Sequence, residues 1–306
     1  MKLKEMLAGK LTKKELSVLP ASFDIVGDIA VFSGMPPELK KKEKLIGEAM
    51  LSHFKNIKVV AKKVKQYSGV YRTPKLQVIA GQRRKETICR ENNAVLKMDI
   101  EKVYFSPRLS EERKRIASLV KPGEEILIMF SGCAPYPIVI ARNSRPKIIY
   151  AIEKNPVAHR YAEENIHLNK LSNVVAIKGD ARKKTLELIK KRHAGFDRIL
   201  MPLPKDSGHF LDACFAAAEP GCIVHFYSFM KEEEIPSPAV NVIKEAAKKY
   251  CAKIRILSWN KCGHYSPGKF RVCIDFKVLK KAKTRLCPKS SLCSDVPHPK
   301  LLLCFF

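Results

Sequence analysis

From about residue 107 onward, short apolar runs alternate with segments of helical spacing, and this alternation restricts the possible folds most strongly. The apolar runs predict strands at 125–130, 148–153, 174–178, 196–201, 222–229, 253–258 and 270–277. The intervening segments predict helices at 138–142, 156–168, 186–191, 209–218 and 240–250. Ser110 is placed to cap a further helix ahead of the first strand. Strands that alternate with helices in this way form a mostly parallel, doubly wound sheet, so we predict a Rossmann-like α/β fold.

The first 102 residues show a different pattern, which predicts a small basic α+β domain. Their spacing predicts a basic helix within 1–20, two strands bent at Gly27, a helix over 37–54, and strands at 58–65, 76–81, 87–92 and 94–102. We therefore expect three parts: 1–102, the Rossmann-like domain 103–281, and a tail 282–306. Prolines interrupt the tail, so we expect it to be disordered. Its Cys287, Cys293 and His298 fit no standard zinc spacing, so we expect no metal site.

The charge of the chain points to a polyanionic partner. Lys and Arg number 58 against 30 Asp and Glu, which gives a net charge of +28. No apolar run approaches the ~18 residues of a membrane span, and the N-terminal segment lacks the apolar core of a signal peptide. The ten cysteines form no CxxC pair, as expected for reduced core residues. These features favour nucleic acid over a membrane as the partner, and a cytoplasmic location.

Three successive strand ends carry residues suited to a nucleoside. Gly132 follows the first strand, Glu153 ends the second, and Asp180 follows the third. A glycine allows close approach to the backbone, and an acid about 20 residues later can hold ribose hydroxyls. A second acid can accept a hydrogen bond from an exocyclic amine. Because a single glycine is a weak phosphate cradle, the pattern resembles class I S-adenosylmethionine methyltransferases. A dinucleotide enzyme with an incomplete glycine motif, or a scaffold with chance acids, remains the alternative.

The fourth strand, 196–201, ends on a rigid corner formed by Pro202, Leu203 and Pro204. Proline has no backbone N–H and cannot continue a sheet ladder. The corner resembles the one with which many base-modifying methyltransferases hold a flat base beside the methyl donor. The alternative is a plain rigid turn between a strand and a helix.

Several separate motifs now resemble one family, the archaeal and eukaryotic tRNA (guanine-N1)-methyltransferases, which modify the purine immediately 3′ of the anticodon, at position 37. The motifs are 20–29, 69–72, 103–113, 129–135, 151–156, 164–169, 179–182, 201–204, 224–227 and 265–275. The resemblance implies S-adenosyl-L-methionine as cofactor, the tRNA anticodon stem-loop as partner, and a monomer. Two departures stand out. Pro202 occupies the position of a family asparagine, and only 19 residues precede Pro20, so we expect a form without the family's elbow-binding domain.

The resemblance also implies residue roles. Guanine N1 carries a proton at neutral pH, so methylation needs a proton acceptor and a cation for the charge that develops on O6. Glu112 matches the family's proposed base, Arg72 the arginine proposed for the base oxygen, and Pro202 the catalytic corner. The implied cofactor contacts are Phe130, Gly132, Glu153, Asn155, Asp180, Ala181 and Arg113. The implied substrate contacts are Arg108, Leu203, Pro204 and Tyr104.

Other interpretations stay open from the sequence. Glu112 has a plain alternative as an acid favoured by the helix dipole. Tyr71, Tyr104, Phe105 and Tyr136 are candidates for base stacking or for core packing. The chain could instead transfer an aminocarboxypropyl group or methylate a wyosine-type precursor at the same tRNA position, and a non-catalytic tRNA-binding protein is a third hypothesis.

Overall fold

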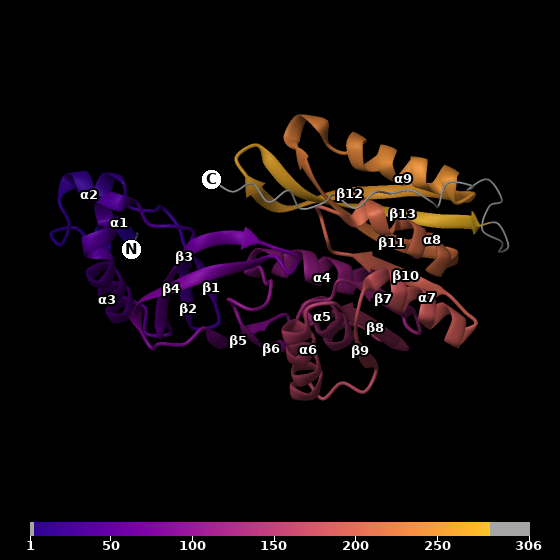
Figure 1. Cartoon of the computed structure of the whole chain (residues 1–306), viewed down its shortest axis with the longest axis horizontal. Coiled ribbons are helices and arrows are strands. Elements are labelled where there is room, and N and C mark those ends of the chain that lie inside the picture. Colours follow the sequence, from indigo (N-terminus) through magenta and orange to yellow (C-terminus); the bar gives the residue numbers. More distant parts are fainter. Residues whose placement is uncertain (1–2, 282–306) are drawn as a thin grey trace, which may run out of the picture.

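The computed structural model describes residues 3–281, so the predicted tail at 282–306 and its Cys287, Cys293 and His298 lie outside the described residues. Figure 1 shows two groups of elements: α1–α3 with β1–β4 at one end of the molecule, and a larger sheet flanked by helices at the other. No described helix is both long enough and apolar enough to span a bilayer.

The N-terminal group is a four-stranded sheet in the order β1-β2-β3-β4. Its elements are α1 (Leu3–Met6), α2 (Lys13–Ser17), β1 (Asp24–Val26), β2 (Ile29–Phe32), η1 (Pro37–Lys42), α3 (Glu43–His53), β3 (Val59–Ser68) and β4 (Thr73–Gly81). The predicted bend at Gly27 is confirmed: its φ is +58°, and a Cβ there would lie 2.2 Å from Thr87 Oγ1. Two short helices replace the single helix predicted within residues 1–20.

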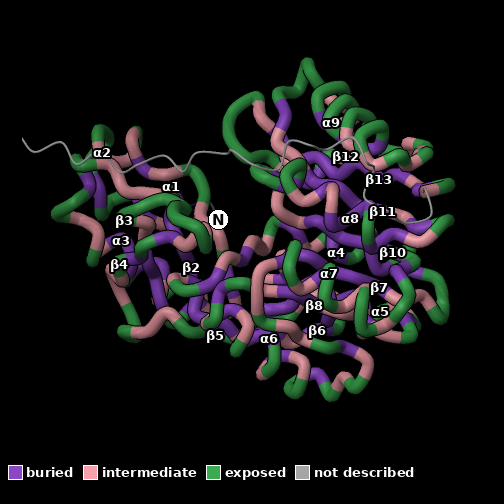
Figure 2. Tube along the Cα trace, turned by 45° about the vertical axis from the view of Figure 1, so that its right-hand side comes forward, coloured by how far each residue is buried: buried purple, intermediate pink, exposed green. Residues whose placement is uncertain are grey.

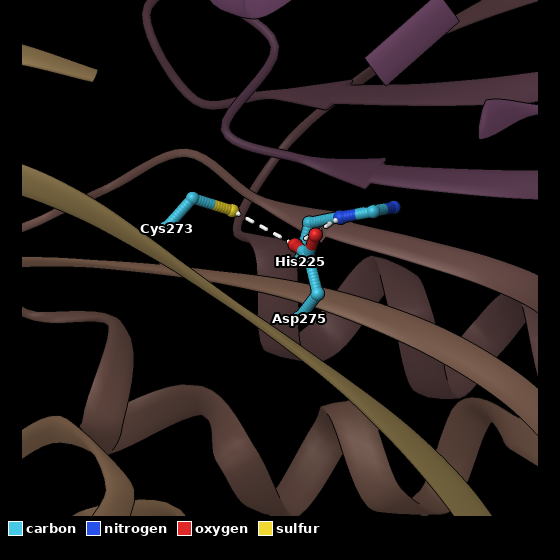
Figure 3. Close-up of side chains that lie close together, drawn as sticks. All are labelled: His225, Cys273 and Asp275. Atoms are coloured by element: carbon cyan, nitrogen blue, oxygen red, sulfur yellow. Dashed lines mark hydrogen bonds and ion pairs between the residues drawn. The ribbon is translucent and has the colours of Figure 1, made fainter. Parts of the chain in front are cut away.

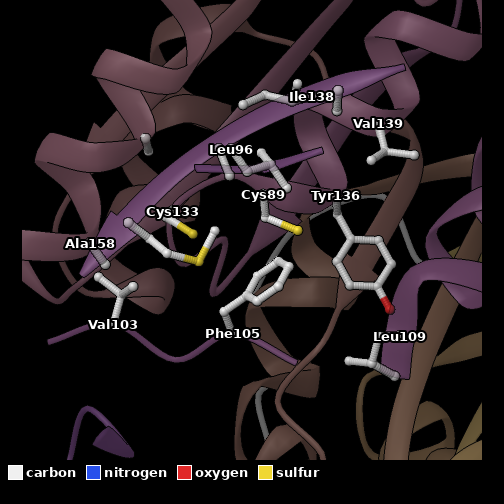
Figure 4. Close-up of a cluster of buried hydrophobic side chains, with 14 of the residues drawn as sticks. Cys89, Leu96, Val103, Phe105, Leu109, Cys133, Tyr136, Ile138, Val139 and Ala158 are labelled. Atoms are coloured by element: carbon white, nitrogen blue, oxygen red, sulfur yellow. The ribbon is translucent and has the colours of Figure 1, made fainter. Parts of the chain in front are cut away.

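A two-stranded hairpin of β5 (Glu86–Glu91) and β6 (Ala94–Asp99) follows. It packs against α6 (Pro156–Leu168), where Asn165 and Asn169 bond to the backbones of Lys97 and Val95 at 2.6–2.9 Å. Figure 4 shows Cys89 and Leu96 of the hairpin in one apolar cluster with Cys133 and Tyr136. The hairpin thus shares the core of the larger part, while a domain boundary at residue 102 stays a prediction.

The larger sheet has seven strands in the order β12-β13-β11-β10-β7-β8-β9. Its strands are β7 (Glu125–Met129), β8 (Ile148–Glu153), β9 (Val174–Lys178), β10 (Phe196–Met201), β11 (Ala218–Lys231), β12 (Ala252–Ser266) and β13 (Lys269–Lys281). β13 pairs antiparallel with both β11 and β12, and the other pairs are parallel. This confirms the predicted Rossmann-like class, although the β12–β13 hairpin is longer than the apolar runs suggested.

Helices cover both faces of this sheet because strand side chains alternate in direction. The helices are α4 (Ser110–Leu119), α5 (Pro135–Asn143), α6, α7 (Ala181–Arg192), α8 (Leu211–Ala217) and α9 (Ser237–Lys249), with short turns η2 (Pro107–Leu109), η3 (Ser207–Phe210) and η4 (Glu232–Glu234). In β7, Ile126 and Ile128 face the cluster of α4–α6, whereas Leu127 and Met129 face the cluster of α7–α9. Figure 2 shows these central strands as the most buried part of the molecule.

The start of α4 differs from the sequence prediction. Ser110 is the first helical residue, the N-cap is Leu109, and no side chain caps the helix. The Ser110 side chain instead accepts a hydrogen bond from Asn92 Nδ2 at 3.0 Å. The prediction of a Ser110 cap is therefore wrong, because the preceding turn η2 already directs the chain into the helix.

Candidate active site

The carboxyl ends of β9, β8, β7 and β10 lie side by side at one edge of the sheet. The direction in which successive strands are added reverses between β7 and β10. Open α/β sheets bind ligands in the crevice outside such a reversal point. The predicted cofactor residues and the predicted proline corner follow these four strands, so the fold brings them to one edge.

The turn after β7 has a tightly constrained backbone. Phe130, Gly132 and Ala134 all have left-handed φ angles, between +59° and +67°. Such angles are unfavourable for residues other than glycine, and strained backbone of this kind concentrates at functional sites. The Gly132 amide donates a 2.6 Å hydrogen bond to Glu153 Oε2, which joins the turn to the end of β8. A Cβ on Gly132 would meet only the Tyr104 carbonyl oxygen, at 3.6 Å.

Glu153 connects the two strand ends. Its other oxygen, Oε1, accepts a 2.6 Å hydrogen bond from the Asn155 amide. Burial raises the pKa of the Glu153 carboxyl, while hydrogen bonds from the Asn155 and Gly132 amides oppose that increase. Asn155 itself is buried and caps α6, and its Nδ2 donates to the Lys102 carbonyl at 2.9 Å. Because that side chain is already engaged, its expected contact with the cofactor stays a prediction.

Asp180 stands at the third strand end and caps α7, accepting from the amides of Arg182 and Lys183 at 3.1 and 3.3 Å. Ala181 is the buried first residue of that helix. Lys154, one residue after β8, lies 3.7 Å from Asp180 Oδ2. The Asp180 and Glu153 carboxylates are therefore at neighbouring strand ends, as predicted.

Aromatic and polar groups next to these acids complete a site suited to a nucleoside. The Phe130 ring meets Phe210 edge-on, with centroids 4.7 Å apart. Among the described residues, Ser131 Oγ is buried without a hydrogen-bond partner, so this turn has an unused polar group. Two carboxylates, an unpartnered hydroxyl and a partly buried aromatic ring match the hydroxyls, amine and flat base of a nucleoside cofactor.

The corner after β10 is closed by its own backbone. Leu203 N donates to the Met201 carbonyl at 2.8 Å, and Ser207 Oγ lies 3.1 Å from the same oxygen. Pro202 and Leu203 stay partly exposed, whereas Pro204 is buried. Pro202 and Leu203 are therefore accessible to a ligand, whereas the buried Pro204 is not.

Arg72 reaches this corner from the N-terminal group. It lies in the loop between β3 and β4 with a φ of +49°, and its Nη2 donates to Asp206 Oδ2 at 3.2 Å. The two residues are 134 positions apart in the sequence. The structure therefore places the predicted oxygen-contacting arginine beside the predicted base-holding corner.

The segment that leads into α4 lies over the glycine turn. Tyr104 accepts a 2.5 Å hydrogen bond from Arg271 Nη2, and its ring meets Tyr67 edge-on at 5.2 Å. Arg108 pairs with Asp24 at 2.8 Å and remains half exposed. Phe105 and Tyr136 are buried in the core, whereas Tyr71 is 45% exposed.

Arg113 is enclosed. Its side chain is 1% exposed and forms an ion pair with Glu91, with Nη2 2.6 Å from Oε2. The guanidinium also lies over the Phe105 ring, 5.0 Å from the centroid. Since the Glu91 carboxylate and the Ser106 carbonyl accept its hydrogen bonds, a cofactor contact by Arg113 stays a prediction.

Glu112 is also buried, with 6% exposure. Arg115 donates hydrogen bonds to both carboxylate oxygens, at 2.7 and 2.8 Å, and Tyr227 donates to Oε1 at 2.7 Å. The Cys262 thiol also hydrogen-bonds to this carboxylate, so four donors surround it. The role of Glu112 as a base stays a prediction.

Sequence reasoning assigned no role to a set of polar residues around Glu112. Arg198, His225, Tyr227 and Asp275 are buried on strands, and a polar residue inside an apolar strand run is the signal that could have found them. Arg115 of α4 is only partly buried and carries no such signal. Figure 3 shows His225, Cys273 and Asp275 together. Their ligand atoms lie within 4.8 Å of one another, but Arg198 and Arg115 donate hydrogen bonds into the group. Two adjacent guanidinium charges make this cluster unsuitable for a metal ion.

The fold and the strand-end site define an enzyme of the class I S-adenosylmethionine-dependent methyltransferase type. The TRM5/TYW2 methyltransferase domain matches residues 87–257, and the TYW2 N-terminal domain matches residues 3–84. The chain therefore belongs to the TRM5/TYW2 methyltransferase family, as the sequence motifs predicted, and S-adenosyl-L-methionine is its cofactor.

Individual relatives agree with this family. The chain is 40% identical to the tRNA (guanine(37)-N(1))-methyltransferase Trm5b of Pyrococcus abyssi, over 85% of this chain and 76% of that protein. It is 34% identical to the tRNA 4-demethylwyosine(37)-methyltransferase Taw21 of Saccharolobus solfataricus, over 83% of this chain and 93% of that protein. A solved complex of aTrm5 with tRNALeu matches with a TM-score of 0.77 and 29% identity, covering 91% of this chain and 78% of that one.

Proposed function

We propose that this enzyme transfers a methyl group to N1 of guanosine 37 in tRNA. The observation that carries the proposal is the position of Arg72 beside the corner at Pro202–Asp206, next to the strand ends that carry Gly132, Glu153 and Asp180. A cation and a flat, donor-poor corner next to a nucleoside site suit a purine base. The relative from Pyrococcus abyssi, named for this reaction, supports the same substrate.

The chemistry assigns distinct tasks to the two charged side chains. The bound cofactor supplies a methyl group on a sulfonium, a good leaving group. As N1 forms its bond to that methyl, N1 must lose a proton, and Glu112 accepts it on its carboxylate. Arg72 donates to the base oxygen O6, where negative charge develops, and so stabilises the transition state.

The remaining site residues bind and orient the two reactants. We assign the cofactor to Phe130, Gly132, Glu153, Asn155, Asp180, Ala181 and Arg113. Glu153 accepts from ribose hydroxyls and Asp180 from the base amine. We assign the target nucleotide to Tyr104, Arg108, Pro202, Leu203 and Pro204. A base must leave its stack before such chemistry, and an anticodon loop provides an accessible base.

A basic cleft extends this site toward the N-terminal group. It has a volume of about 430 Å³ and is lined by Lys65, Lys75, Lys102, Tyr71 and Asn155. It also contains one acid, Glu101, which Lys85 pairs at 2.7 Å. Asn155 lies at the end of β8, so the cleft adjoins the proposed cofactor site. We propose that it holds phosphates of the anticodon stem-loop, that the enzyme acts as a monomer, and that it works in the cytoplasm.

A second candidate reaction has specific support. Pro202 replaces the asparagine that the family usually has at this corner, and the relative Taw21 is named for methylation of 4-demethylwyosine. The same site could therefore methylate a wyosine-type precursor at position 37, or transfer an aminocarboxypropyl group to it. These products differ from 1-methylguanosine in the mass added to the base.

The test is mass analysis of the nucleosides after reaction of the purified chain with S-adenosylmethionine and an unmodified tRNA transcript. We expect 1-methylguanosine from a transcript with guanosine at position 37 and no product from a matched transcript with adenosine there. Binding of both transcripts without any modified base would favour a non-catalytic tRNA-binding protein. Product from a wyosine-precursor tRNA alone would establish the second candidate instead.

A further inference from the structure

A row of buried polar side chains crosses the face of the large sheet that α4 covers. Arg198 lies on β10, His225 on β11 and Asp275 on β13, all at most 4% exposed. The register places His225 opposite Asp275, and Leu200, two residues from Arg198, opposite His225. Because strand side chains alternate, these three polar residues share one face.

The hydrogen bonds along this row fix the state of His225. An arginine guanidinium only donates, so His225 Nε2, 2.7 Å from Arg198 Nη1, must accept. The proton of the neutral ring is then on Nδ1, which donates to Asp275 Oδ1 at 2.7 Å. Burial, more than the nearby arginine charges, lowers the pKa of His225, which agrees with a neutral ring.

The row continues from the sheet to the proposed base. Arg115 Nη1 donates to Asp275 Oδ2 at 2.8 Å, and its Nε and Nη2 grip the two oxygens of Glu112. The Arg115 guanidinium therefore forms ion pairs with two carboxylates, those of Glu112 and Asp275. At the other end, Glu124 pairs with Arg198 through two bonds of 2.6 and 2.8 Å.

The charges of these hydrogen-bonded side chains do not cancel. The set contains three carboxylates, on Glu112, Glu124 and Asp275, and two guanidiniums, on Arg115 and Arg198. One negative charge is therefore in excess. A buried excess of negative charge favours proton uptake. Glu124 is matched by Arg198, so the shared cation Arg115 lies between the two remaining carboxylates, Glu112 and Asp275, and Glu112 is the one proposed above as the base.

We propose that Asp275, oriented by His225, is a positioning residue that keeps Glu112 basic by taking a share of Arg115. Without Asp275, Arg115 would be committed to Glu112 alone, and the carboxylate would become a weaker base. This inference deepens the proposed function and rests on Glu112 as the proton acceptor. It also links the base to β10, the strand that ends at the Pro202 corner.

Other groups around Glu112 do not supply the same effect. Tyr227 of β11, Tyr136 of α5, Cys262 of β12 and Cys273 of β13 face it, and burial raises the pKa of each, so they stay neutral. On its own helix, Arg113 is neutralised by Glu91, Arg115 pairs with Glu112 itself, and Glu111 and Lys114 are exposed to solvent. Asp275 is therefore the charged group that can change how Arg115 acts on Glu112.

The test is the pH profile of single-turnover methyl transfer for Asp275→Asn. We expect the acid limb to move to lower pH by about one unit, because Glu112 loses a neighbouring negative charge. The plateau rate should fall about tenfold, since a weaker base transfers the proton less readily. The affinities for tRNA and cofactor should not change. Asp197→Asn, which removes an exposed carboxylate at the opposite end of β10, is the matched control and should keep the wild-type profile.

A pair of substitutions at His225 separates positioning from folding. His225→Asn retains a donor near the place of Nδ1 and should keep the acid limb close to wild type. His225→Leu removes that donor but keeps the Asp275 charge, so it should move the acid limb in the same direction as Asp275→Asn by a smaller amount. Loss of rate at every pH with an unmoved acid limb in both Asp275→Asn and His225→Leu would overturn the inference.

The design distinguishes this inference from the proposed function. If the wild-type chain forms no modified base at position 37, the proposed function fails. If the wild-type chain is active and Asp275→Asn keeps both its rate and its pH profile, only the positioning role fails. The same profiles can be recorded on a wyosine-precursor tRNA if that is the substrate that reacts.

Discussion

Arg72 shows how an exposed loop residue can belong to an active site that a distant segment builds. Its partner Asp206 lies just after the corner, and both side chains are partly exposed, at 22% and 50%. An ion pair with that much solvent contact contributes little to stability. The interaction is therefore better explained by a need to hold Arg72 near the substrate base than by a need to hold the fold together.

Two alanine substitutions separate these explanations, because each one removes the same ion pair. Arg72→Ala should lower kcat for methyl transfer by about 10²-fold, since a donor to the developing O6 charge is lost. Asp206→Ala should keep kcat within a few-fold, and both variants should keep the wild-type Tm within a few degrees. Steady-state kinetics and thermal unfolding are the measurements. An equal loss of kcat in the two variants would contradict a direct role for Arg72.

Glu153 combines burial with two backbone hydrogen bonds, so its charge matters to the glycine turn as well as to a ligand. Glu153→Gln can accept only one of these bonds well and has no charge for ribose hydroxyls. We expect the Kd for S-adenosylmethionine to rise between about tenfold and a hundredfold, with tRNA binding unchanged. Calorimetric titration measures this. Glu163→Gln, on the exposed side of α6, removes a carboxylate away from the site and serves as control.

At the scale of elements, the polar row across β10, β11 and β13 should make stability depend on pH. The pKa of His225 lies below its ordinary value of 6.5 in the folded protein. The unfolded chain therefore takes up a proton near pH 6.5 while the folded chain does not. By linkage, the stability that this neutral ring contributes is complete above pH 6.5 and is lost as the pH falls below it.

Denaturant unfolding at pH 7.5 and 5.5 measures this effect. The wild-type free energy of unfolding should fall between these pH values by about 1 kcal/mol more than that of His225→Asn. The other seven histidines are present in both proteins, so the difference isolates His225. Identical pH dependence in the two proteins would mean that His225 titrates equally in the folded and unfolded states.

The strands and the residues at their ends were predictable because they depend on local pattern. An apolar run followed by Gly132, Glu153 or Asp180 is visible in the sequence, and parallel strands bring such ends to one edge. The polar row was not predictable in the same way. Arg198, His225 and Asp275 meet only through strand register, and Arg115 joins them only because α4 packs on that face. Likewise, the pairing of Arg113 with Glu91 depends on the hairpin β5–β6 packing against the later part of the chain.

At the scale of the whole molecule, the net charge is +28, but the basic side chains are not all equally available to bind a partner. Several basic side chains of the N-terminal group are already paired, as Lys62 is with Glu43 and Lys85 with Glu101. Lys65, Lys75 and Lys102 line the cleft beside the proposed site, and Lys102 stays 62% exposed although it lies 3.3 Å from Asp99 Oδ2. Phosphate binding should therefore depend on these three residues more than on the total charge.

Replacing Lys65, Lys75 and Lys102 together by alanine tests this distribution. Each phosphate contact contributes nearly one unit to the slope of log Kd against log salt concentration, or about 0.7 on a single strand. The triple variant should bind an anticodon stem-loop at least tenfold more weakly at about 0.1 M salt, with a slope lower by about two. Lys190, Lys191 and Lys248 are exposed on α7 and α9, so their triple alanine variant changes the total charge equally. If both variants lost affinity to the same extent, the tRNA would respond to total charge and the cleft would have no special role in binding.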